Sequence, residues 1–421
     1  MQHPPIASPE NSPSSLAPMY SRSRRVMSAL MLSSVLISGA AACANGPETA
    51  TADVSTVAAT YDPVSLREYE PTPDCVDPPT SAEKWQKMFG NIDGWLAGDD
   101  IVSGPELPGN RKIFFTGDHL ATANNVGNQG DKKFVHNGLV TVCGDDAKLT
   151  NPGVEAIPNP SPTEWYWPNA TVVIKDNMYV YADRVTSSDE APGFKLTGTD
   201  IAVFSMPKEA DGLPMHETTL RLDTKPNSKV AWGKSAVASE DGYIYEYGTH
   251  TSGEDLDFGR DVYVSRIKST DLENHKLVHE YWNGRDWVNS QKEAKAIIRS
   301  PRMAGLDQSW VTQTIEKNGE EQILFIAKKD GQFGTEIGQW TSDSPQGKFA
   351  YHRLVKLPKP EDNGLTYLAN PLNLGAKGSK TVLVALSNNK DQSHLTPKEA
   401  LIEMAEKPQD FTPTVMEVTR K

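Results

Sequence analysis

The chain has 421 residues, with 42 lysines and arginines against 55 aspartates and glutamates, which gives a formal net charge of −13. This acidity argues against a nucleic-acid partner, because phosphates require a basic surface. The length would allow two domains, but closed β architectures often reach this size as one unit. Since no interior stretch after residue 80 reads as a linker, we expect one domain over residues 80–421.

Residues 1–42 have the composition of an export signal. Arg24 and Arg25 precede an apolar run at 26–37 that is too short and too rich in small residues for a convincing membrane span. The run ends in SGAAAC, which resembles a bacterial lipoprotein cleavage site and predicts lipidation of Cys43. The alternative is an ordinary secretory signal that leaves Cys43 as an incidental thiol. We expect an anchor on the outer face of the cytoplasmic membrane and a disordered tether over residues 43–79.

The remaining cysteines, Cys75 and Cys143, form an even pair in an exported protein, which favours a disulfide. The nine histidines show no HExxH spacing and no CxxC occurs, so neither a metal nor another cofactor is expected. Only His119 and His250 stand out, and a surface or loop position is the simpler expectation for each.

Two helices are predicted at the edges of the β region. Thr80-x-x-Glu83 reads as a capping box for a helix that ends at Gly90. A second helix is predicted after a similar capping pattern of Thr396, Pro397 and Glu399. Residues 411–418 follow as a terminal strand that could close the fold by pairing with an early or a late sheet.

Between these helices, strand-like runs alternate with turn residues, and the pattern predicts an all-β, five-bladed β-propeller. Aromatic and β-branched residues dominate runs such as 178–181, 243–247 and 262–267. Anchor residues recur at a spacing of roughly 57 to 78 residues, which leaves room for about four short strands per unit. These anchors are Asp99, Trp165, Trp232, Trp310 and Tyr367. The alternative is a β-sandwich with additional elements, since no sequence repeat is exact.

The order of several short motifs resembles a family of exported actinobacterial five-bladed β-propellers, formerly a domain of unknown function, that includes endo-D-arabinanases. The motifs are GDDIVS at 98–103, KIFFTGD at 112–118, FVHN at 134–137, WYWP at 165–168, AWG at 231–233, DGYIYEYG at 241–248, SDSPQG at 342–347 and LSNN at 386–389. The chain departs from the family pattern at Asn370, where a histidine is expected, and at Asn169-Ala170, where a Gly/Asp pair is expected. The resemblance therefore supports the fold more than the activity.

Carboxylate pairs are the candidate catalytic groups, because glycosidic bonds are usually cleaved by one protonated and one ionised carboxyl group. The candidates are Asp99, Asp100, Asp118, Glu246 and Glu336. Of the adjacent pair Asp99 and Asp100, one is expected in a solvated turn, since neighbouring strand residues point to opposite faces. Asp118 could equally be a turn residue, and solvent-facing strand positions are the simpler expectation for Glu246 and Glu336.

Sugar binding requires aromatic platforms and polar contacts. Trp165 and Trp167 share one face of an extended segment, so one could stack on a sugar, although core packing is the alternative for both. The polar candidates are Asn137, Asn169, Lys234, Arg260 and Asn370. Together these residues favour a surface-anchored glycoside hydrolase whose partner is arabinofuranose-containing cell-wall polysaccharide. The alternative is a non-catalytic propeller lipoprotein that binds a glycan or a protein.

Overall fold

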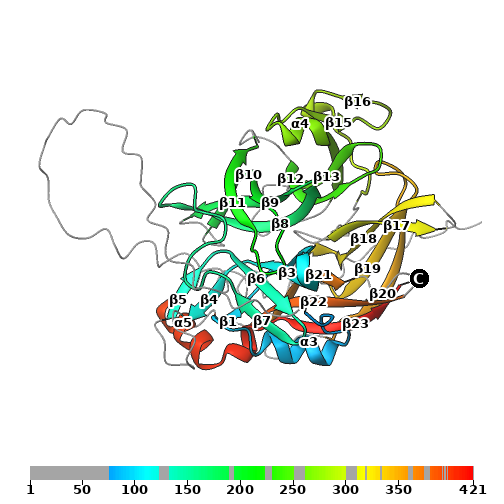
Figure 1. Ribbon diagram of the computed structural model, residues 1–421. Helices are drawn as coiled ribbons and strands as arrows, with labels where there is room; N and C mark the ends of the chain where they lie inside the picture. Colours follow the sequence, from blue (N-terminus) through cyan, green and yellow to red (C-terminus); the bar gives the residue numbers. More distant parts are fainter. Residues whose placement is uncertain are drawn as a thin grey trace, which may run out of the picture.

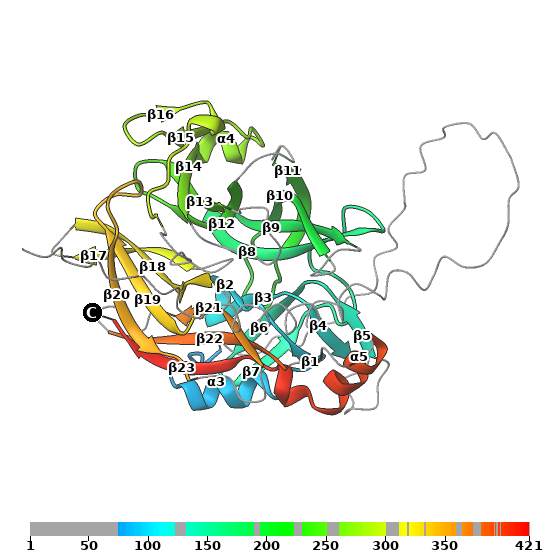
Figure 2. The same cartoon turned by 180° about the vertical axis from the view of Figure 1, so that it is seen from behind.

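The computed structural model describes residues 75–122, 132–188, 194–222, 230–250, 261–299, 311–317, 320–331, 334–358, 364–373, 380–390, 392, 395 and 397–420. The protein is all-β, with antiparallel strands in six sheets and a few short helices (Figures 1 and 2). In the described part, no helix is both long and apolar enough to cross a membrane.

Five of the sheets follow one another around the molecule in chain order (Figure 1). The first contains β2 (Val102–Leu107), β3 (Arg111–Thr116), β6 (Gly138–Cys143) and β7 (Asp146–Leu149). The second contains β8 (Glu164–Ile174), β9 (Asn177–Ser187), β10 (Phe194–Ser205) and β11 (Met215–Arg221). The third contains β12 (Val230–Ala238), β13 (Tyr243–His250), β14 (Val262–Lys268), β15 (His279–Trp282) and β16 (Trp287–Val288).

The fourth sheet contains β17 (Val311–Lys317), β18 (Glu320–Lys329), β19 (Glu336–Ser342) and β20 (Ala350–Lys356). The last contains β21 (Leu365–Asn373), β22 (Thr381–Asn389) and β23 (Thr414–Thr419). A sixth, smaller sheet of β1 (Trp95–Gly98), β4 (His119–Thr122) and β5 (Lys132–Val135) is built from segments that flank β2 and β3 in the chain. The helical segments are α3 (Ala82–Phe89), η1 (Pro108–Asn110), α4 (Ser269–Glu273), η3 (Gln291–Glu293), α5 (Pro397–Glu406) and η6 (Pro408–Phe411).

The first strands of the five larger sheets face a common axis, which makes the fold propeller-like. β8 contacts β2 and β12, β12 contacts β17, and β21 contacts β2 and β18. Side chains bond neighbouring sheets at these junctions: the Thr171 hydroxyl donates to the Ser103 carbonyl at 3.0 Å, and the Ser103 hydroxyl donates to the Pro371 carbonyl at 2.6 Å. Ser235 and Thr312 share a hydrogen bond of 2.6 Å between β12 and β17. This closed arrangement rules out the β-sandwich alternative.

The hydrophobic core lies between adjacent sheets. Phe115 of the first sheet meets Phe204 of the second edge-to-face at 5.5 Å, and Tyr247 of the third meets Phe325 of the fourth at 4.7 Å. Alternate residues of each strand therefore pack against the preceding and the following sheet. The first strand of each sheet lies nearest the axis and presents small and polar residues to it.

The predicted anchors mark the starts of the sheets. Trp165 lies in β8, Trp232 in β12 and Tyr367 in β21, while Asp99 directly follows β1 and lies three residues before β2. Trp310 lies outside the described residues.

The two ends of the described chain meet. Gln86 of α3 donates to the Pro413 carbonyl at 3.0 Å and accepts from the Val415 amide at 2.9 Å. β23 pairs with β22, so the terminal strand joins the late sheet. The cap of α3 is Ser81 and not Thr80, because the Ser81 hydroxyl accepts from the Lys84 amide.

The predicted disulfide is confirmed. The sulfur atoms of Cys75 and Cys143 are 2.03 Å apart, and the bond joins the segment before α3 to the end of β6 across 68 residues of sequence. The predictions for Cys43 and for the tether lie almost wholly outside the described residues, which begin at 75.

Candidate active site

Three aspartates meet at the point where the first sheet adjoins the last. The Asp99 amide donates to the Asp118 carbonyl at 3.0 Å, and the Gly117 amide donates to the Asp99 carbonyl at 2.9 Å. A methyl group placed on Gly117 would lie 3.0 Å from Asp99 Oδ1 and 3.6 Å from Asp100 Oδ2. The side chains of Asp99 and Asp100 therefore both lie near Gly117, on the same side of its backbone. We call Asp99, Asp100 and Asp118 the aspartate cluster.

The backbone at Asp100 explains why both adjacent side chains join the cluster. Asp100 has a φ of 53°, in the left-handed region that costs a non-glycine residue about 1–2 kcal/mol. Its amide donates to the Ser387 hydroxyl at 2.9 Å, which fixes this conformation. The expectation that one of the two aspartates is a solvated turn residue is therefore wrong: Asp100 is 7 % exposed and Asp99 is partly buried.

Asp118 is held by two side chains rather than by a local turn. Nδ1 of His136 lies 2.9 Å from Asp118 Oδ1, and the Trp167 indole N–H donates to the same oxygen at 2.7 Å. The His136 ring stacks on Trp165 at a centroid distance of 4.5 Å, which restricts its orientation. The described bonds to the Asp118 carboxylate thus end on Oδ1, which leaves Oδ2 for a ligand.

The electrostatics of the cluster set Asp99 apart. Burial, followed by the negative charge of Asp118, raises the pKa of Asp99 from 3.8 to about 7, against the opposing effect of a hydrogen bond from Tyr367. Asp99 is therefore protonated in a large fraction of molecules at neutral pH. A carboxyl group that retains its proton beside a second carboxylate is the usual arrangement for acid–base chemistry.

Two residues of the last sheet complete the cluster. The Tyr367 hydroxyl donates to Asp99 Oδ2, and Asn370 Nδ2 lies 3.4 Å from Asp100 Oδ1. Asn370 was predicted as a polar contact to substrate, and the structure brings it to the aspartates with 1 % exposure.

A cavity of about 360 Å³ lies between the first strands of the first four sheets, and the three aspartates are not among its lining residues. Its walls are Val102–Pro105, Asn169–Val173, Ser235–Ala238 and Thr312–Thr314, which supply hydroxyl and apolar groups and no charged side chain. Asn169 is 4 % exposed, and its Nδ2 has no hydrogen-bond partner among the described residues. The predicted contact residue Asn169 therefore lines this cavity, two residues after Trp167, while its amide nitrogen is enclosed by the protein.

Glu246 and Glu336 lie elsewhere. Glu246, in β13, is 1 % exposed and accepts from Tyr181 at 2.8 Å and from Ser265 at 3.0 Å, with His279 Nε2 2.9 Å away. It faces the second sheet, so the expected solvent-facing position is wrong. Glu336, in β19, is bonded to Lys329 and Tyr351 in the fourth sheet. Like the three aspartates, neither glutamate is among the residues that line the central cavity.

The remaining predicted contacts have structural surroundings. Asn137 is fully buried and bonds the Ile157 amide and carbonyl with its side chain, so its assignment to substrate is corrected. Trp165 is 3 % exposed and packs in the interior. Trp167 packs against the same cluster and donates a hydrogen bond to Asp118. Lys234 is buried in an ion pair with Asp183 rather than at the acidic surface.

The predictions for His119, His250 and Arg260 have three different outcomes. His119 is fully buried in β4, which corrects the expected surface position, and burial lowers its pKa to about 4. His250 ends β13, at an intermediate exposure. Arg260 lies outside the described residues. Among the described residues, no three His, Cys, Asp or Glu side chains are arranged to hold a metal ion.

Sequence analysis missed His136 and Tyr367 as site residues. His136 lies within the FVHN motif and Tyr367 is one of the recurring anchors, so the sequence pattern had marked both residues without indicating a role in the site. Their partners could not be found from spacing, because Tyr367 and Asp99 are 268 residues apart.

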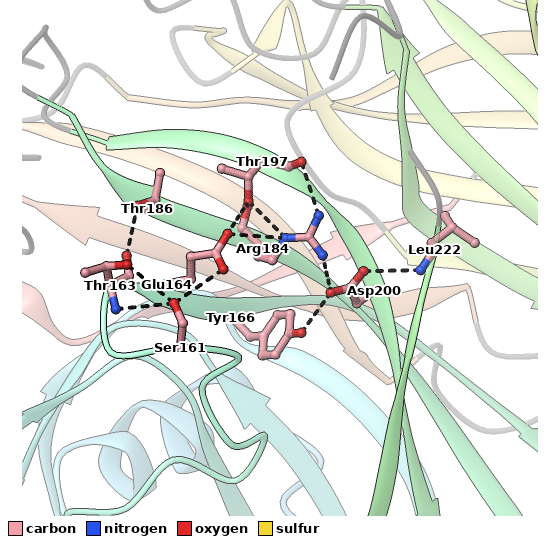
Figure 3. A network of polar contacts seen from close by, with 9 residues as sticks. All are labelled: Ser161, Thr163, Glu164, Tyr166, Arg184, Thr186, Thr197, Asp200 and Leu222. Atoms are coloured by element: carbon pink, nitrogen blue, oxygen red, sulfur yellow. Dashed lines mark hydrogen bonds and ion pairs between the residues drawn. The ribbon is translucent and has the colours of Figure 1, made fainter. Parts of the chain in front are cut away.

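A second polar network, in the second sheet, is structural (Figure 3). Arg184 donates to Asp200 Oδ2 at 2.6 Å and to the Thr197 hydroxyl at 3.0 Å. Asp200 also accepts from the Tyr166 hydroxyl at 2.8 Å and from the Leu222 amide at 3.2 Å. The opposite charges are paired and both carboxylate oxygens accept bonds, so the loss of either partner would leave an uncompensated buried charge in the sheet.

Comparison with known proteins gives a family and a fold. A family model described as "Domain of unknown function (DUF5005)" matches residues 82–399, more than half of the chain. No curated protein matches the sequence. A crystal structure of a protein described as a "putative hydrolase" from Bacteroides ovatus has a TM-score of 0.58 at 16% identity, covering 80% of this chain and 89% of that one.

Two further structures are less similar. A glycoside hydrolase family 43 arabinoxylan arabinofuranohydrolase from Bacillus subtilis gives a TM-score of 0.43 at 13% identity, with 78% of this chain and 66% of that chain covered. The Cellvibrio cellulosa alpha-L-arabinanase gives 0.40 at 9% identity, with 77% and 91% covered. At these identities a similarity concerns the fold alone, and only the Bacteroides structure is close enough to support it.

Proposed function

We propose that this chain, which belongs to the DUF5005 family, is a glycoside hydrolase that acts on arabinofuranose-containing polysaccharide of the cell envelope. The observation that carries the proposal is the aspartate cluster, where Asp99, whose pKa is raised to about 7, adjoins the Asp118 carboxylate. Hydrolysis of a glycosidic bond requires one protonated and one ionised carboxyl group in one site.

In the proposed reaction, the protonated Asp99 donates its proton to the glycosidic oxygen as the bond to the anomeric carbon breaks. Asp118 acts at the anomeric carbon, either as the nucleophile or as the base that takes a proton from water, and water supplies the new hydroxyl group of the sugar. His136 and Trp167 orient Asp118 through Oδ1, so Oδ2 is the reacting oxygen. Asp100 keeps the local charge negative, which favours an oxocarbenium-like transition state.

The fold supports this proposal in a general way. We regard the five sheets that surround the axis as five propeller blades and the β1–β4–β5 sheet as an addition to the first. The structurally similar Bacteroides protein is itself described as a "putative hydrolase". The choice of an arabinan, and of endo-D-arabinanase-like action, rests on the ordered motifs of the sequence.

The proposed location is the outer face of the cytoplasmic membrane, because the SGAAAC sequence before residue 44 fits lipidation of Cys43. Detergent partitioning of wild type and Cys43→Ala tests this location. Recovery of both proteins in the aqueous phase would contradict it.

The activity is tested by incubating the purified protein with arabinogalactan and measuring released oligosaccharides. Asp99→Asn and Asp118→Asn each remove an ionisable group at nearly constant shape, so we expect kcat to fall at least about 100-fold while the protein stays folded. Asp286→Asn, at a well exposed position in the third sheet, is the control and should retain full activity. If wild type releases nothing but retains arabinan on a column, the protein is a glycan-binding lipoprotein instead.

A further inference from the structure

The last sheet delivers two polar side chains to the aspartate cluster through an irregularity in β21. Tyr367 contacts Asp99 and Asn370 contacts Asp100, although the two residues are three positions apart. In a regular strand, such residues point to opposite faces. The register with β22 shifts between Tyr367 and Ala369, and Leu368 has a φ of 51°. This bulge adds one residue and turns both side chains toward the aspartates.

Tyr367 is itself held in place. Asn389 Nδ2 donates to the Tyr367 oxygen at 2.7 Å, so the tyrosine hydrogen is directed to Asp99 Oδ2. The backbone of β22 reinforces this arrangement, because Ser387, two residues before Asn389, accepts from the Asp100 amide. Adjacent parts of β21 and β22 thus contact both members of the Asp99–Asp100 pair.

We propose that Tyr367, oriented by Asn389, is a positioning residue for Asp99 in the hydrolase reaction. The proposal rests on the proposed function for its catalytic meaning, but the contacts that carry it are independent of any substrate. Tyr367 fixes one oxygen of Asp99, so the other oxygen, Oδ1, is the atom that exchanges its proton with the glycosidic oxygen. Asn389 prevents the hydroxyl from turning away to serve another of the nearby carboxylates.

The charges around Asp99 predict the direction of the effect. The titratable groups that face it are Asp100, Asp118 and Tyr367, with His119 and His136 beside Asp118. Of these, the hydrogen bond from Tyr367 opposes the effects of burial and of Asp118 on the pKa of Asp99. Without the hydroxyl, Asp99 should hold its proton to a higher pH.

The test is Tyr367→Phe, which removes one oxygen atom and keeps the ring. In protein with ¹³C-labelled aspartate carboxyl groups, we expect the Asp99 resonance, identified with Asp99→Asn, to titrate about one pH unit higher than in wild type. On arabinan, kcat should fall about tenfold with KM nearly unchanged, and the alkaline limb of the pH–rate profile should move to higher pH.

Tyr351→Phe is the matched control, since Tyr351 donates to the Glu336 carboxylate at 3.2 Å in the fourth sheet. It should leave the titration of Asp99 unchanged. If Tyr367→Phe does not fold, Asn389→Ala frees the tyrosine and should shift Asp99 in the same direction by a smaller amount. The proposal is overturned if Asp99 titrates at the wild-type pH in these variants, or if Tyr351→Phe shifts it equally. A shifted Asp99 in a protein that cleaves no arabinan supports the positioning role and refutes the hydrolase function.

Discussion

Two carboxyl groups in this protein, the partly buried Asp99 and the buried Glu246, have similar hydrogen-bond partners and opposite pKa shifts. Each accepts a hydrogen bond from a tyrosine of an adjacent sheet, Tyr367 for Asp99 and Tyr181 for Glu246. Burial disfavours ionisation of both. Nevertheless, the pKa of Asp99 is raised to about 7, whereas the pKa of Glu246 is lowered.

The charge of the next neighbour explains the difference. Asp99 adjoins Asp118, a second negative charge, while Glu246 adjoins His279, whose pKa the glutamate raises despite burial. The His279 charge and three hydrogen bonds outweigh burial at Glu246. Burial alone therefore does not identify a candidate catalytic carboxyl group in this fold; a carboxylate neighbour distinguishes Asp99, for which we propose catalysis, from Glu246 in its pair with His279.

The largest effect on stability is expected for Glu246→Ala. The variant leaves the buried His279 without its partner, so the free energy of unfolding should fall by about 3–5 kcal/mol, as measured by urea denaturation. The control is Glu280→Ala in the same sheet, which removes a more exposed partner of Arg266 and should cost less than about 1 kcal/mol. Equal losses for the two variants would contradict the structural importance of the Glu246–His279 pair.

The contributions of Asp99 and Glu246 to the free energy of unfolding should change with pH in opposite directions. Asp99 has a folded pKa above its ordinary value of 3.8, so its ionisation destabilises the fold increasingly from about pH 4 to pH 7. Glu246 has a lowered folded pKa, so its contribution is present above its ordinary value of 4.5 and is lost as the pH falls through the folded pKa.

Asp99→Asn should therefore be more stable than wild type at pH 8, with the difference shrinking toward pH 4. Urea unfolding midpoints across this range measure it. A variant that is less stable than wild type by the same amount at both pH values would show that Asp99 carries no such electrostatic cost.

A smaller effect is expected from Gly117→Ala, which probes how closely the aspartates pack. The added methyl carbon would lie 2.9 Å from Asp100 Cβ and 3.0 Å from Asp99 Oδ1, so the carboxylates must shift. We expect kcat/KM on arabinan to fall about tenfold, because misplaced catalytic groups lose rate steeply. Gly90→Ala, whose added carbon would lie 3.5 Å from the Lys87 carbonyl oxygen in ordinary contact, should leave the activity unchanged.

Local pattern determined much of what could be predicted. Period-two strands and turn residues predicted an all-β fold, and the anchors Trp165, Trp232 and Tyr367 do lie in the first strands of successive sheets. Two cysteines that follow a predicted export signal were enough to predict their bond. These features depend on neighbours in sequence or on simple pairing, so composition and spacing carry them.

The tertiary structure decided which polar residues share a site. Periodicity showed that Glu246 faces away from Tyr245 and Tyr247, but only the packing of β13 against the second sheet placed it beside Tyr181. The left-handed turn at Asp100 and the bulge at Leu368 both override the alternation of strand residues. Their stabilisation comes from residues such as Ser387, 287 positions from Asp100, and contacts of that range leave no trace in local sequence.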